Sequence, residues 1–73
     1  MASPQRQARI YAIREHMQSH IAMLKEELNI FFDNPVGVVS DKSYFDHIED
    51  KVVELAEYQG ALDALDQHFK EGK

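Results

Sequence analysis

The chain has 73 residues, and its 8 lysine and arginine residues against 13 aspartate and glutamate residues give a formal net charge of −5. This length allows one small domain, and the absence of cysteine excludes a disulfide framework, a thiolate zinc site and a cysteine nucleophile. The negative charge disfavours nucleic acid and anionic lipid as partners. The short apolar runs predict neither a membrane span nor a signal peptide.

The first expected element is a helix over residues 4–32. Ser3 is typical of an N-cap and Pro4 of the first helical position, where the missing N–H of proline costs nothing. Apolar residues then recur every three or four positions, which keeps them in one stripe on one side of the helix. The stripe consists of Ile10, Ile13, Met17, Ile21, Leu24, Leu28 and Phe31.

A loop over residues 33–43 is expected to follow. The residue before Pro35 is disfavoured in the α region, and Gly37 permits a positive φ angle. Ser43, followed three residues later by Asp46, resembles a capping box for the next helix. Three loop valines show no helical spacing, and we expect them to fold back over the end of the helices: Val36, Val38 and Val39.

A second helix is expected over residues 44–70. Either Tyr58 or Gln59 occupies the middle of its apolar stripe, and Gly60 interrupts it at a cost of about 1 kcal/mol relative to alanine. Close packing is the expected compensation for this glycine. The other members of the stripe are Phe45, Ile48, Val52, Leu55, Leu62, Leu65 and Phe69.

The loop between the helices predicts an all-α fold, an antiparallel two-helix hairpin that forms a single domain over residues 1–73. In an antiparallel hairpin, the numbers of facing residues have a constant sum. A sum of about 76 places the apolar stripes of the two helices opposite each other. The predicted layers are Phe31–Phe45, Leu28–Ile48, Leu24–Val52, Ile21–Leu55 and Ile13–Leu62.

Two helices alone leave each stripe open on one side. Further apolar residues extend the apolar surface of both helices beyond the predicted seam: Met23, Ile30, Phe32, Val53, Ala61 and Ala64. We therefore expect a homodimer in which two hairpins form a four-helix bundle.

His16 and His20 are the clearest candidate metal ligands. Their spacing of four residues places both imidazoles on one side of the helix, as a metal site requires. Three interpretations are open: a metal site, a pH-sensitive association, or a His20 that packs beside Met17 and Leu24 and is hydrogen bonded to Gln59 or to the backbone. The last is favoured, because the two histidines lack the glutamate of a metalloprotease motif. We therefore predict no metal and no cofactor.

The start of the first helix is basic, with no acidic residue between positions 5 and 14. Its side chains could contact phosphates and stack on a base, which makes a nucleic-acid-binding homodimer the alternative function. The residues for such a contact are Arg6, Arg9, Tyr11 and Arg14. The favoured interpretation is that these arginines pair with acids of the second helix, notably Asp63 and Asp66.

Aromatic and valine side chains gather where the loop joins the two helices. Since aromatic anchors dominate protein interfaces, this is the best candidate surface for docking a partner protein; the alternative is that the cluster caps the core. Its members are Phe31, Phe32, Val36, Val38, Val39, Tyr44 and Phe45. No phosphate loop or nucleophile elbow occurs, so we predict a non-catalytic interaction module and no enzyme.

Three segments carry a resemblance to a known group of proteins: residues 29–38 (NIFFDNPVGV), 55–58 (LAEY) and 64–69 (ALDQHF). Together they resemble small uncharacterised helical proteins encoded by tailed phages of marine cyanobacteria, over residues 24–70. The resemblance implies a short phage protein in the cytoplasm of the bacterial host and no particular activity. By analogy, it implies an accessory protein that binds a host or virion component.

Overall fold

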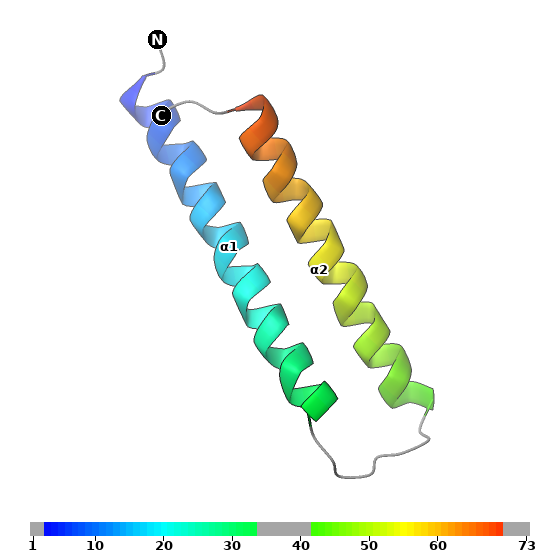
Figure 1. Cartoon of the computed structure of the whole chain (residues 1–73). Coiled ribbons are helices and arrows are strands. Elements are labelled where there is room, and N and C mark those ends of the chain that lie inside the picture. The colour runs from blue at the N-terminus through cyan, green and yellow to red at the C-terminus, as the bar shows by residue number, and fades with distance from the viewer. Residues whose placement is uncertain (1–2, 34–41, 70–73) are drawn as a thin grey trace.

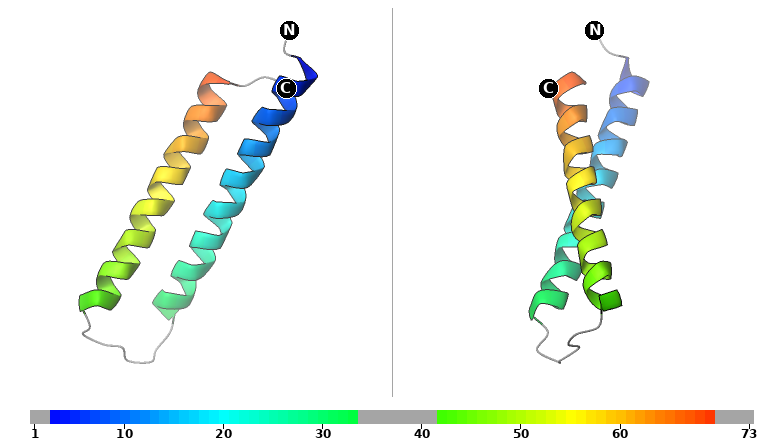
Figure 2. Two further views of the ribbon diagram at one scale, coloured as in Figure 1. Left: turned by 180° about the vertical axis from the view of Figure 1, so that it is seen from behind. Right: turned by 90° about the vertical axis from the view of Figure 1, so that its right-hand side faces the viewer.

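The computed structural model describes residues 3–33 and 42–69, which form two helices and no strand. Helix α1 spans Pro4–Asp33 and α2 spans Lys42–His68. The two helices run antiparallel, side by side (Figure 1). We call the end where α1 finishes and α2 begins the tip, and the opposite end the open end. Figure 2 shows that the helices form a single layer and cross at a shallow angle. The predicted all-α hairpin is confirmed.

Helix α1 begins as predicted. The backbone N–H of Arg6 donates to the Ser3 hydroxyl oxygen at 3.1 Å, and the N–H of Gln7 donates to the Ser3 carbonyl at 3.0 Å. Ser3 is thus the N-cap, and Pro4 is the first helical residue. The helix ends at Asp33, one residue beyond the predicted boundary.

Helix α2 begins and ends two residues earlier than predicted. Because it begins at Lys42, Ser43 lies inside its first turn. At the other end, the N–H of Phe69 donates to the Leu65 carbonyl at 2.8 Å and closes the last turn. The helix therefore ends well before Gly72, the residue from which its end was predicted.

The core is a narrow strip between the helices. Five apolar side chains are buried to between 4% and 9% exposure: Ile10, Ile21, Leu24 and Leu28 of α1 and Leu62 of α2. The prediction that Ile13, Phe45 and Val52 complete this core is wrong, because these side chains are 48%, 55% and 44% exposed.

Helix α2 turns only part of its predicted apolar stripe toward α1. Leu62 and Tyr58, one of the two residues expected in the middle of the stripe, face α1, but Phe45 and Val52 do not. Tyr44 and Tyr58, fourteen residues apart, each place a ring against α1, and Lys51 midway between them forms an ion pair with α1. Long side chains with polar tips can cover apolar surface while their tips reach water. They replace Phe45 and Val52, which turn outward as a result.

Neither helix, within the described residues, is long and apolar enough to cross a membrane. Gly60 lies on the exposed side of α2, and a Cβ atom added to it would meet no atom within 4 Å. The prediction that close packing compensates for this glycine is therefore wrong.

Replacing Gly60 by alanine should raise the free energy of unfolding by about 1 kcal/mol, because alanine has the higher helix propensity and meets no neighbour here. Urea denaturation followed by circular dichroism measures the change. The matched control is Ala64→Gly, one turn further along the same side of α2, which should lower the free energy of unfolding by a similar amount. A loss of stability in Gly60→Ala would contradict the open surroundings of this residue.

Candidate functional site

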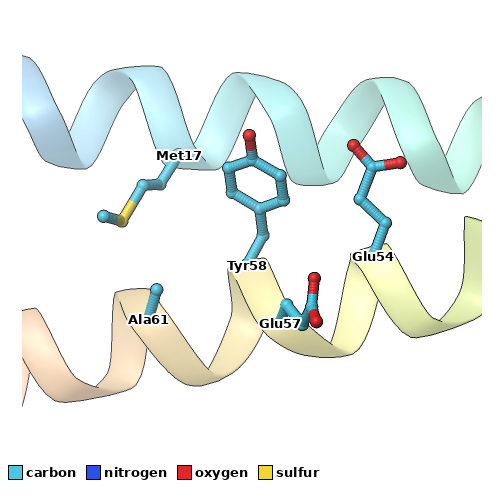
Figure 3. A pocket seen from close by; sticks show the side chains of 5 residues that line it. All are labelled: Met17, Glu54, Glu57, Tyr58 and Ala61. Carbon is cyan, nitrogen blue, oxygen red and sulfur yellow. The ribbon is translucent and has the colours of Figure 1, made fainter.

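One face of the hairpin is built around Tyr58. The Tyr58 ring stacks on His20 of α1, with ring centroids 4.5 Å apart and planes 10° apart. Beside this stack, Met17, Glu54, Glu57, Tyr58 and Ala61 line a hollow of about 460 Å³, and Figure 3 shows Tyr58 and Glu54 projecting from α2 toward α1. We call this surface the Tyr58 face.

The Tyr58 face places His20 differently from the favoured sequence interpretation. His20 is half-buried in the seam as expected, but its partner is the Tyr58 ring, and the Gln59 amide instead donates to Asp63 at 3.2 Å. Tyr44, Lys51 and Tyr58 follow one another at intervals of seven residues. Including such long side chains with polar tips in the predicted stripe of α2 would have identified this contact.

His16 and His20 lie close together on α1. Their ring centroids are 5.0 Å apart in an edge-to-face arrangement. Within residues 3–33 and 42–69, no group of three histidine, cysteine or acidic side chains is placed to hold a metal ion. Zinc sites in proteins use at least three protein ligands, so this pair is incomplete in a single chain.

On the side of the hairpin opposite the Tyr58 face, an ion pair joins the two helices. The Arg14 guanidinium donates from Nε to Asp66 Oδ1 at 2.7 Å, and its Nη2 atom lies 2.6 Å from the same oxygen. Phe32 lies eighteen residues, or five turns, beyond Arg14 and so shares this side of α1, while Val52 and Phe45 share the corresponding side of α2. We call this surface the Phe32 face.

The candidate nucleic-acid residues do not form one basic surface. Arg14 is engaged by Asp66, as the favoured interpretation predicted, whereas Asp63, the other predicted partner, accepts a hydrogen bond from Gln59 of its own helix. Arg9 and Tyr11 are exposed, and Arg9 projects about 140° away from Arg14 around the helix. Arg6 lies in the first turn of α1 and is exposed as well. Arg6 and Arg9, three residues apart, are neighbours on one side of α1, whereas Arg14 projects elsewhere and pairs with Asp66.

The candidate docking residues at the tip divide into two groups. Phe31 and Tyr44 are half-buried, with rings 5.7 Å apart, and the Tyr44 hydroxyl donates to the Phe31 carbonyl at 3.5 Å. Phe32 and Phe45 are 63% and 55% exposed. The remaining candidates, Val36, Val38 and Val39, lie outside the described residues. One group therefore packs between the helices, and the other faces outward.

Comparison with protein-family models, with curated proteins and with solved structures found no match for the chain. The resemblance to small phage proteins therefore stays a prediction.

Replacing Asp66 by asparagine should lower the free energy of unfolding by about 1 kcal/mol in low salt, because the change removes a charge-assisted contact that joins the helices. Urea denaturation at low and high sodium chloride measures the effect, which should shrink as salt screens the charges. Asp63→Asn is the matched control, since Asp63 contacts only its own helix. Equal losses in the two variants would contradict the assignment.

Proposed function

We propose that the chain is a non-catalytic protein interaction module that works as a homodimer, two hairpins forming a four-helix bundle. The observation that carries this proposal is the imbalance between buried and exposed apolar side chains. Five are buried, whereas nine large ones among the described residues are exposed: Tyr11, Ile13, Met23, Ile30, Phe32, Phe45, Val52, Val53 and Phe69.

The shape of the chain supports the same proposal. Its extents are 55 × 15 × 14 Å, so the hairpin is one helix thick, whereas stable domains consist of at least two packed layers. The accessible surface is 5614 Å², compared with about 4600 Å² for a compact monomer of this mass. The excess resembles the roughly 800 Å² that each partner buries in a standard interface.

Light scattering coupled to size-exclusion chromatography should give a mass of twice 8.4 kDa at micromolar concentration. The physical reason is that a second hairpin supplies the missing layer and covers exposed apolar side chains. The measurement is repeated over a range of loading concentrations. A folded chain with a mass of 8.4 kDa at every concentration would contradict the proposal.

We propose that the Phe32 face is the docking surface for a further protein. Phe32, Phe45 and Val52 are all at least 44% exposed, and they lie near the tip on one side of the hairpin. Large exposed aromatic side chains are typical anchors of protein interfaces. The resemblance to phage proteins suggests a host or virion component as the partner.

Replacing Phe32 by serine should leave the free energy of unfolding within about 0.5 kcal/mol of the wild type, because most of this side chain is already in water. The neighbouring change Phe31→Ser should lower it by about 2 kcal/mol, because that ring packs on Tyr44 and His47. Urea denaturation compares the two variants. Equal destabilisation would show that both rings cap the core and would remove Phe32 as a docking residue.

A further inference from the structure

We propose that the second copy docks on the Tyr58 face in an antiparallel orientation, and that Arg9 of each copy pairs with Glu27 of the other. This inference rests on the homodimer proposed above and specifies its surface, its orientation and the ion pair that selects them. In this arrangement α1 of one copy lies along α1 of its partner.

Arg9 and Glu27 mark the two ends of one stripe along α1. They are eighteen residues apart, which is five full turns, so they project on the same side of the helix. Ile13, His16 and His20 follow Arg9 at spacings of four, three and four residues and fill the stripe between the charges. The stripe belongs to the Tyr58 face, because His20 stacks on Tyr58 and Glu27 pairs with Lys51 at 3.1 Å.

Both charges are available for a second copy. Arg9 is exposed and has no ion-pair partner within the described residues. Glu27 pairs with Lys51 but keeps 48% of its side chain exposed. Between the two charges, Ile13 is 48% exposed, and Met17 and Ala61 border the hollow beside Tyr58. The face therefore offers apolar side chains beside the acids Glu54 and Glu57, with a cation toward the open end and Glu27 toward the tip.

Such a surface is complementary to itself under a two-fold axis. An axis that crosses α1 midway between Arg9 and Glu27 passes at position 18, which is also the middle of Pro4–Asp33. Two antiparallel copies of α1 then overlap along their whole length, and each Arg9 meets a Glu27. The pairing of Arg9 with Glu27 and the complete overlap of the two α1 helices thus require the same two-fold axis.

The parallel orientation does not bring Arg9 to Glu27. It would lay α1 of one copy over α2 of the other at the same level along the hairpin. The Glu27–Lys51 contact fixes these levels, and Glu54 lies three residues from Lys51. At these levels Glu27 would lie over Lys51 of the partner with Glu54 beside it. Arg9 would lie near Phe69, so this orientation does not form the Arg9–Glu27 pairs.

The Phe32 face is the weaker candidate for the second copy. Phe32, Phe45 and Val52 all lie toward the tip, so an antiparallel copy would place them against the charged open end. Docking on the Tyr58 face leaves these three side chains free for the further partner.

Charge reversal tests the ion pair. Arg9→Glu should raise the dimer dissociation constant about tenfold or more, because the introduced carboxylate would then oppose Glu27 of the partner. The double variant Arg9→Glu with Glu27→Arg should restore it to near the wild-type value. The two positions are about 27 Å apart along one helix, so this rescue can arise only between chains. Analytical ultracentrifugation measures the dissociation constants.

Lys25→Glu is the matched control, because it makes the same change of net charge on the other side of α1. It should leave the dissociation constant within about threefold of the wild type. A stable wild-type dimer that Arg9→Glu does not weaken would overturn the assigned face while leaving the homodimer intact. A wild-type chain that stays monomeric would instead overturn the proposed function itself.

Spin-label distances test the orientation, and the absence of cysteine allows single labelling sites. Asp33 is fifteen residues from position 18, so labels on Asp33→Cys should lie about 45 Å apart in the antiparallel dimer. A parallel dimer would bring them within about 20 Å. Labels on Gln18→Cys, near the axis, should lie within about 25 Å in the same dimer. A short distance between labels at position 33 would overturn the antiparallel arrangement.

Discussion

A pair of helices can bury only one strip along each helix, because each cylinder has a single neighbour and every other side faces water. The described structure follows this constraint closely. Its core consists of five side chains, from Ile10 near the open end to Leu28 near the tip, with Leu62 from the second helix. Among the exposed apolar side chains, Ile13 lies on the Tyr58 face, and Phe32, Phe45 and Val52 lie on the Phe32 face. The proposed functions all derive from these two faces.

The two faces differ in chemistry. On the Tyr58 face, Met17 and Ala61 lie beside the acids Glu54 and Glu57, and we propose that Arg9 and Glu27 on this face meet a second copy of the same surface. The Phe32 face has an internally satisfied ion pair between Arg14 and Asp66 and three exposed apolar side chains near the tip. Under the two proposals, self-association and the binding of another protein would each use a surface of its own.

The sequence was sufficient for the architecture. The Ser3-Pro4 start, the three- and four-residue spacing of the first stripe and the turn residues after Asp33 predicted α1 and the hairpin, because these signals are local and depend on backbone chemistry. The same local reasoning anticipated that Arg14 pairs with Asp66, since the residues lie at similar levels in an antiparallel hairpin.

The contact side of α2 could not be predicted in the same way. Hydropathy assigned Phe45 and Val52 to the core, whereas the structure uses Tyr44, Lys51 and Tyr58. A narrow seam favours side chains whose apolar stems cover the neighbouring helix while their tips reach water. The spacing of apolar residues does not predict this preference. The side that α2 turns toward α1, and therefore the composition of the two faces, is known only from the structure of the packed helices.

The central claim is that folding and association of this chain are coupled, because one layer of helices lacks a second layer to pack against. The most direct test is thermal unfolding, followed by far-ultraviolet circular dichroism, over a hundredfold range of protein concentration. A coupled dimer predicts that the melting temperature rises with concentration. A helical chain whose melting temperature stays constant over that range would contradict the claim.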